Sequence, residues 1–136
     1  MPKRIQRKRT KGWRMPPNTI YVGRSTKWGN PIEVNTPKKD IRWRLFDGQE
    51  ASHSGAVDAF ERLVFAAQKS KKNTMVYCYR QRQRVHFRRL PPGDKRIRLI
   101  AAVVYDLEEL RGKDLACWCP LDKPCHADVL IKLANR

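Results

Sequence analysis

The stretch "DLACWCPLDKPCHADVLIKLAN", residues 114–135, joins an alternating run, a loop with two prolines and an amphipathic run. Cys117 and Cys119 stand two positions apart in the alternating run, which predicts a short buried strand over residues 114–119. The amphipathic run predicts a helix over residues 125–135, because its large apolar residues fall on one side. These are Val129, Leu130 and Leu133. The stretch therefore predicts a strand–loop–helix corner that carries three of the four cysteines.

The runs that precede this corner predict the rest of a small α/β fold. Apolar residues at helical spacing predict helices over residues 56–68 and 97–105. Residues with high β-propensity predict strands over residues 19–23 and 75–79, and a shorter strand around residues 41–46. Strands and helices thus alternate without an internal repeat. The fold class that we expect is a single small α/β domain, in which a short β-sheet is flanked by helices.

Polar residues and one glycine mark where some of these elements begin and end. Ser54 is expected to cap the helix over residues 56–68. Asp106 and Glu109 have the spacing of a capping box, which predicts a separate helical turn after the second helix. Gly112 is well placed to end that turn.

The charge of the chain restricts its partners. The 136 residues include 30 Lys and Arg against 13 Asp and Glu, which gives a net charge of +17. A surface this basic repels itself and is neutralised by a polyanion, so we expect a nucleic acid or a phosphorylated nucleotide as partner. A basic surface that serves only solubility is the alternative. The oligomeric state does not follow from the sequence.

Neither a membrane nor a secreted location is expected. No run approaches the ~18 apolar residues of a spanning helix. No apolar stretch follows the basic N-terminus, as it would in a secretory signal. Three cysteines are clustered and Cys78 stands alone, whereas a disulfide framework spaces its cysteines through the chain. Reduced thiols and a cytoplasmic location follow as predictions.

The first basic segment, residues 1–17, is predicted to be a loosely docked arm ahead of a domain over residues 18–136. Its cations would bind phosphates without sequence preference, because they release condensed counterions. Arg7, Lys8 and Arg9 are the candidates. A disordered tail that improves solubility is the alternative.

A second basic segment covers residues 69–96 of the domain. Within it Arg82, Arg84, His86 and Arg88 alternate with other residues. On one extended strand they would share a face and form a basic comb. Its arginines are candidates for contact with nucleic acid.

Three hypotheses compete for the Cys/His cluster. In the first, Cys117, Cys119, Cys125 and His126 bind zinc, for which thiolates and imidazole are suitable ligands. The Cys-x-Cys spacing and the adjacent Cys-His pair fit the common zinc patterns poorly, since neighbouring side chains diverge. In the second, the cluster lines a catalytic pocket, where Cys125 or His126 is a nucleophile or general base and Asp128 orients the imidazole or is itself a base. In the third, the cysteines pack as small apolar residues.

A second polar loop, "GRSTKWGN" (residues 23–30), follows the first predicted strand. Gly23 would let a ligand approach, Arg24 and Lys27 would hold an anionic group, Trp28 would stack on a base, and Asn30 would hydrogen-bond. In the alternative interpretation, Trp28 is buried in the core and Asn30 forms a turn. Ligand sites in open α/β sheets collect at the carboxyl ends of the strands, so we expect this loop and the Cys/His loop to form one pocket.

Two blocks of this sequence, "IYVGRSTKWGNPIEV" and "LRGKDLACWCPLDKPCHADVLIKLAN", resemble a bacterial and phage family, domain of unknown function 4326 (DUF4326). Ser25 and Ile32 depart from the family pattern, which commonly has proline and phenylalanine there, and neither change removes a reactive group. The resemblance implies no reaction. By comparison with compact members of the family, residues 69–96 are expected to be a basic insertion. The resemblance also implies two sets of motif residues: Gly23, Arg24, Lys27, Trp28, Gly29, Asn30 and Pro31; then Gly112, Lys113, Cys117, Trp118, Cys119, Cys125, His126 and Asp128.

Two functional hypotheses follow. The first is a protein that binds a nucleotide or nucleic acid through a Cys/His site; if it is an enzyme, a glycosyl or base-modifying reaction on that ligand would suit the site. The alternative is a non-enzymatic DNA- or RNA-binding module whose zinc stabilises the last strand and helix.

Overall fold

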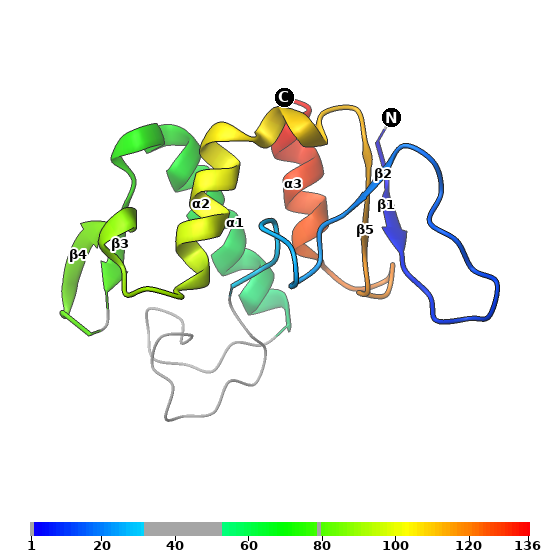
Figure 1. Ribbon diagram of the computed structural model, residues 1–136, viewed down its shortest axis with the longest axis horizontal. Helices are drawn as coiled ribbons and strands as arrows, with labels where there is room; N and C mark the ends of the chain where they lie inside the picture. Colours follow the sequence, from blue (N-terminus) through cyan, green and yellow to red (C-terminus); the bar gives the residue numbers. More distant parts are fainter. Residues whose placement is uncertain (1, 32–52, 79) are drawn as a thin grey trace.

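Three short parallel strands form a sheet at one end of the molecule (Figure 1). The computed structural model describes residues 2–31, 53–78 and 80–136. In spatial order the strands are β1 (Arg4–Gln6), β5 (Asp114–Cys117) and β2 (Thr19–Tyr21). The central strand β5 is buried from Leu115 to Cys117, as expected for a parallel strand that is covered on both faces. The predicted strand around residues 41–46 lies outside the described residues.

Strand β1 corrects the prediction of a loosely docked arm over residues 1–17. Ile5 pairs with Ala116 in parallel register, so this part of the segment is an edge strand of the sheet. The backbone N–H of Arg7 continues the ladder by donating to the carbonyl of Cys117 at 2.9 Å. Strand β1 has one apolar residue between two polar ones, which is too little for hydrophobic periodicity to indicate a strand.

Three α-helices of the described residues fill the middle of the molecule (Figure 1). They are α1 (His53–Ser70), α2 (Lys95–Tyr105) and α3 (His126–Ala134), and α3 is the one that packs against the sheet. The periodicity that predicts α1 is confirmed, because Phe60, Val64 and Ala67 are fully buried. Ser54 lies inside α1 and not ahead of it, so the predicted cap position is wrong. The expected small α/β domain is confirmed.

A two-stranded antiparallel hairpin lies at the other end of the molecule from the sheet (Figure 1). It consists of β3 (Met75–Cys78) and β4 (Gln83–His86), with short 3-10 helices on either side, η2 (Lys71–Asn73) and η3 (Phe87–Arg89). Val76, Val85 and Phe87 are buried in the hydrophobic core. The basic segment over residues 69–96 therefore contributes to the core, and its first and last residues belong to α1 and α2.

The predicted basic comb is only partly formed. Arg84 and His86 lie on β4, where they alternate with the buried Val85. Arg82 lies in the turn before β4 with a φ of 52°, and Arg88 lies in η3 after it. The alternating sequence therefore spans a turn, a strand and a 3-10 helix, so it cannot present all its cations on one face.

The turn after α2 forms as predicted but for a different reason. It is the 3-10 helix η4 (Leu107–Leu110), and the side chain of Asp106 makes no capping hydrogen bond there. Asp106 and Glu109 instead bind Lys27. Gly112 follows with a φ of +73°, which favours glycine, and ends this segment. Among the described residues, no helix has the length and apolar character needed to cross a membrane.

Candidate metal centre and adjoining cavity

The corner between β5 and α3 brings an adjacent cysteine and histidine together. Cys125 is the N-cap of α3 and has extended backbone angles, φ −146° and ψ 146°, while His126 is the first helical residue. Because the chain bends at this point, the two side chains converge, and Cys125 Sγ lies 3.7 Å from His126 Nδ1. The backbone N–H of Ala127 donates to the same sulfur at 3.5 Å. The sequence suggests that adjacent side chains diverge, but the N-cap conformation removes that objection.

The sulfurs of the clustered cysteines lie close together. Cys117 Sγ lies 3.8 Å from Cys119 Sγ and within 4.8 Å of Cys125 Sγ. Hydrogen bonds from the Cys119 and Cys125 thiols hold the pKa of Cys117 well below its ordinary value. The pKa of Cys125 is raised, chiefly because its thiol donates to Cys117. Cys117 is therefore the thiol of the metal-free cluster that ionises most readily. None of the four cysteines forms a disulfide.

His126 is held in one tautomer. Its ring is 5 % exposed, and Nε2 lies 2.6 Å from the carbonyl oxygen of Val22. A carbonyl can only accept, so Nε2 carries the proton and donates, which leaves the lone pair of Nδ1 directed towards Cys125. The ring of Phe60 packs against the imidazole edge-on with centroids 5.3 Å apart. Burial lowers the pKa of His126 and favours the neutral imidazole, the form that binds metal ions.

Cys117, Cys125 and His126 form a group that could hold a metal ion. Their donor atoms all lie within 4.8 Å of one another, and the three residues are buried. Histidine ligands in metal sites usually donate their second ring N–H to a carbonyl or carboxylate, as His126 does to Val22. Thiolate and imidazole donors favour borderline or soft metal ions over magnesium or calcium.

Arg4, which the sequence gave no reason to single out, holds the loop of the cluster. Its side chain is only 8 % exposed, and Nη2 donates to the carbonyls of Leu121 at 2.9 Å and Lys123 at 2.8 Å. Its Nε lies 3.2 Å from a carboxylate oxygen of Asp128. Asp128 thus binds Arg4, and His126 takes its orientation from Val22, so the predicted role of Asp128 in orienting the imidazole is wrong.

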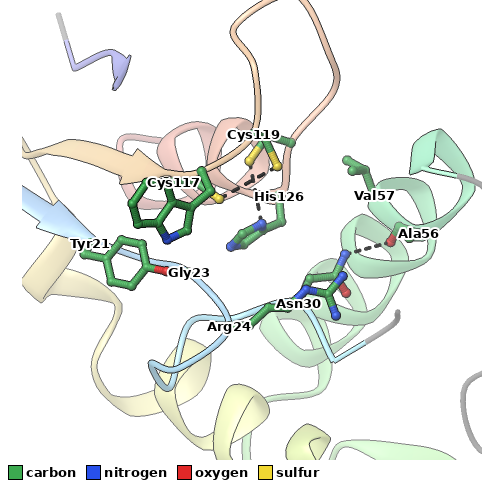
Figure 2. A pocket seen from close by; sticks show the side chains of 11 residues that line it. Tyr21, Gly23, Arg24, Asn30, Ala56, Val57, Cys117, Cys119 and His126 are labelled. Carbon is green, nitrogen blue, oxygen red and sulfur yellow. Dashed lines mark hydrogen bonds between the residues drawn. The ribbon is translucent and has the colours of Figure 1, made fainter. Parts of the chain in front are cut away.

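A cavity of about 270 Å³ adjoins the cluster (Figure 2). It lies at the carboxyl ends of β2 and β5 and beside the first residue of α3. Both polar loops line it, which confirms that the two motifs form one pocket. Figure 2 draws the sulfurs and the imidazole on one side of this space, with Arg24 and Asn30 on another. The residues that line the cavity include Tyr21, Arg24, Asn30, Trp118, Cys119 and His126.

Two residues of the first loop do not have their predicted roles. Trp28 is 3 % exposed and belongs to the hydrophobic core, so it cannot stack on a ligand. Lys27 Nζ lies 2.9 Å from Asp106 and 2.7 Å from Glu109. The hydrogen bond to Glu109 raises the pKa of Lys27 most, and the hydrogen bond to Asp106 raises it further. Neither side chain lines the cavity; one secures the loop to the core and the other to η4.

Other residues of this loop shape the cavity wall. A Cβ on Gly23 would lie 2.0 Å from the hydroxyl of Tyr21, so the glycine makes room for this side chain, and both residues line the cavity. Asn30 is buried and donates to the carbonyl of Ala56 at 3.1 Å, which ties the loop to α1. Arg24 is exposed and lines the cavity.

Two arginines of the basic N-terminal segment lie against aromatic rings of the cavity lining. The guanidinium carbon of Arg7 is 4.4 Å from the ring centroid of Tyr21 and 4.8 Å from that of Trp118. Arg9 lies 5.0 Å from the Trp118 ring. Lys8 is exposed. Arg82, Arg84 and Arg88 are exposed as well, but they belong to the hairpin at the other end of the molecule (Figure 1).

These features define a small α/β protein with a candidate metal centre beside a cavity at the carboxyl edge of its sheet. The chain belongs to the family described as Domain of unknown function (DUF4326), whose model matches residues 5–136. The resemblance drawn from two motif blocks is thereby confirmed over nearly the whole chain. No curated protein and no solved structure matches it.

Proposed function

We propose that this protein binds a phosphorylated nucleotide or a nucleic acid in the cavity beside the Cys/His cluster. The observation that carries the proposal is that both motif loops line one cavity at the carboxyl ends of parallel strands. Ligands of open α/β sheets bind at this edge, where helix N-termini favour phosphate. Arg24 adds a guanidinium to the wall, and the net charge of +17 favours an anionic ligand.

The aromatic rings at the cavity favour a nucleotide over a simple anion. Tyr21 and Trp118 line the cavity, and Trp118 is 38 % exposed. Aromatic and guanidinium groups side by side suit a base and its phosphate, since rings stack on bases and arginines bind phosphates. Arg7 and Arg9 would provide the phosphate contacts.

The hairpin favours a polymer as the ligand. Its exposed arginines lie at the opposite end of the molecule from the sheet (Figure 1). A free nucleotide bound in the cavity cannot reach them, whereas an extended nucleic acid contacts both surfaces through its phosphates. Nucleic acid is therefore expected to bind more tightly than a mononucleotide, and with a steeper dependence on salt.

Zinc is the ion that we propose for the cluster. Buried thiolates with a neutral imidazole match the donor set of zinc sites. The geometry supports a catalytic role less well. Asp128 binds Arg4, and His126 Nε2 donates to Val22, so neither is placed as a base towards the cavity. Binding, with zinc stabilising the β5–α3 corner, is therefore proposed in place of a glycosyl or base-modifying reaction.

The binding proposal is tested by fluorescence polarisation with labelled single-stranded and duplex oligonucleotides, with mononucleotides as competitors. Arg24→Ala is expected to weaken binding about tenfold or more, the loss that follows from one charge-assisted contact. Arg111→Ala is the matched control, because it removes the same charge from an exposed position that does not line the cavity. Equal losses for both variants would exclude the cavity as the site. Undetectable binding at low salt would exclude the function itself.

A further inference from the structure

We infer that Cys119 completes the metal centre as its fourth ligand, and that Arg4 is the positioning residue that balances the charge of this centre. The inference rests on the proposed zinc site and decides its type. A centre with only Cys117, Cys125 and His126 would keep an open position for water, as catalytic zinc sites do, whereas four protein ligands make a closed structural site.

Two distances in the metal-free cluster already match edges of a tetrahedron, whereas Cys119 lies outside the group whose donor atoms are all within 4.8 Å of one another and must move closer when the metal binds. Zinc binds sulfur at about 2.3 Å and nitrogen at about 2.0–2.1 Å, so tetrahedral angles place two sulfurs about 3.8 Å apart and a sulfur and a nitrogen about 3.6 Å apart. Cys117 Sγ and Cys119 Sγ are 3.8 Å apart. Cys125 Sγ and His126 Nδ1 are 3.7 Å apart. These two contacts share no atom, as is required of opposite edges of one tetrahedron.

Cys117 and Cys125 join those two edges. The donor atoms of Cys117, Cys125 and His126 lie within 4.8 Å of one another. Cys119 is already at the separation of a co-ligand from Cys117, so it competes with water for the fourth position at a much higher local concentration.

Arg4 supplies the positive charge that a centre with three thiolates requires. Three thiolates and a neutral imidazole around Zn²⁺ carry a net charge of −1, and a buried charge of this kind requires a partner. The side chain of Arg4 is 8 % exposed, and it binds the loop between Cys119 and Cys125. Among the described residues its Nη1 is buried without a hydrogen-bond partner, although Nε and Nη2 are bound. A thiolate cluster accounts for a buried guanidinium that is left with a donor to spare.

The same side chain fixes the loop that carries the ligands. Arg4 Nη2 binds the carbonyls of Leu121 and Lys123, which lie between Cys119 and Cys125. Strand β1 therefore holds the span between two ligands at its correct separation. Partners of this type typically change metal affinity by about 10–100-fold when they are removed.

The coordination is tested on the full-length protein loaded with zinc, by metal analysis and X-ray absorption at the zinc edge. Three sulfurs and one nitrogen around a single zinc are the expected result. Two sulfurs with nitrogen and oxygen would overturn the fourth-ligand assignment but leave the zinc proposal standing. A protein that binds no zinc would overturn both.

Variants test the two residues separately, with zinc affinity measured by competition with a chromophoric chelator. Cys119→Ser is expected to lower affinity at least about tenfold, while Cys78→Ala, which removes a thiol outside the cluster, leaves it unchanged. Arg4→Met is expected to lower affinity about 10–100-fold, and Arg4→Lys less, because lysine keeps the charge but cannot bind both loop carbonyls. Lys3→Met is the control for loss of charge. Wild-type affinity in Arg4→Met, or an equal loss in Lys3→Met, would overturn the role of Arg4.

Discussion

The burial of His126 predicts how the metal-free protein responds to acid. The ring is 5 % exposed, and burial lowers its pKa below the ordinary value of 6.5. The unfolded chain therefore takes up a proton near pH 6.5 that the folded protein does not. Unfolding is then favoured by acid, so the stability contributed by His126 is fully present above that pH and is lost as the pH falls through it.

The size of the effect follows from one proton. If the folded imidazole stays neutral, lowering the pH from about 7.5 to about 5.5 reduces the free energy of unfolding by up to about 1.4 kcal/mol through His126 alone. The lowered pKa of Cys117 acts in the same direction, because the unfolded thiol is protonated in this range while the folded one is ionised. The wild-type protein is therefore expected to lose more unfolding free energy over this pH range than His126 alone accounts for.

His126→Gln separates the two contributions. Glutamine does not titrate, and its amide retains a donor for the carbonyl of Val22. Urea unfolding after chelation, at both pH values, is the measurement. The variant is expected to lose up to about 1.4 kcal/mol less than the wild-type protein between them. An identical loss in both proteins would mean that the buried imidazole does not resist protonation.

Four further predictions concern the metal, the loops and the ligand. Chelation of zinc is expected to lower the free energy of unfolding by about 2.7 kcal/mol where free zinc stands at 100 times its Kd, as measured by denaturant titration with and without the metal. Lys27→Met removes two partly exposed ion pairs and is expected to cost about 0.2–1 kcal/mol for each pair, without a change in ligand affinity. Gly23→Ala places a Cβ 2.0 Å from the Tyr21 hydroxyl and is expected to lower the free energy of unfolding by about 1–3 kcal/mol. The loss should be smaller when Tyr21→Ala is present in the same chain, and simple additivity of the two changes in this double-mutant cycle would contradict the clash. Arg84→Ala is expected to reduce the slope of the logarithm of the nucleic-acid binding constant against the logarithm of salt concentration by about 1, the value for one phosphate contact. An unchanged slope would show that Arg84 of the hairpin does not contact the nucleic acid.

Local patterns were enough for some of this fold. The helical spacing of Phe60, Val64 and Ala67 identifies the buried face of α1, and alternation identifies β5, although that strand ends at Cys117 and not at residue 119. Local patterns failed where a neighbour distant in sequence decides the structure. Arg4 gives no periodic signal, yet β5 makes it part of an edge strand.

Sequence patterns likewise predicted only part of the candidate site. The two polar loops were expected at one edge because parallel strands end together, and they do line one cavity. The roles inside those loops were predicted less well. Trp28 has the chemistry of a stacking residue but is buried, while Trp118 is the exposed ring at the cavity. Residue type alone does not distinguish the two.

The identities of the residues set which chemistry the protein carries: a basic chain, a Cys/His cluster at the end of one strand, and a polar loop after another strand. Which of these groups meet depends on how the chain folds. Cys125 and His126 converge because the chain turns into α3 between them, and the carbonyl of Val22 selects the tautomer of the imidazole. Arg4 reaches the cluster only because β1 pairs with β5. Side-chain chemistry is a local property, whereas burial, charge pairing and ligand geometry depend on contacts between segments more than a hundred residues apart in the chain.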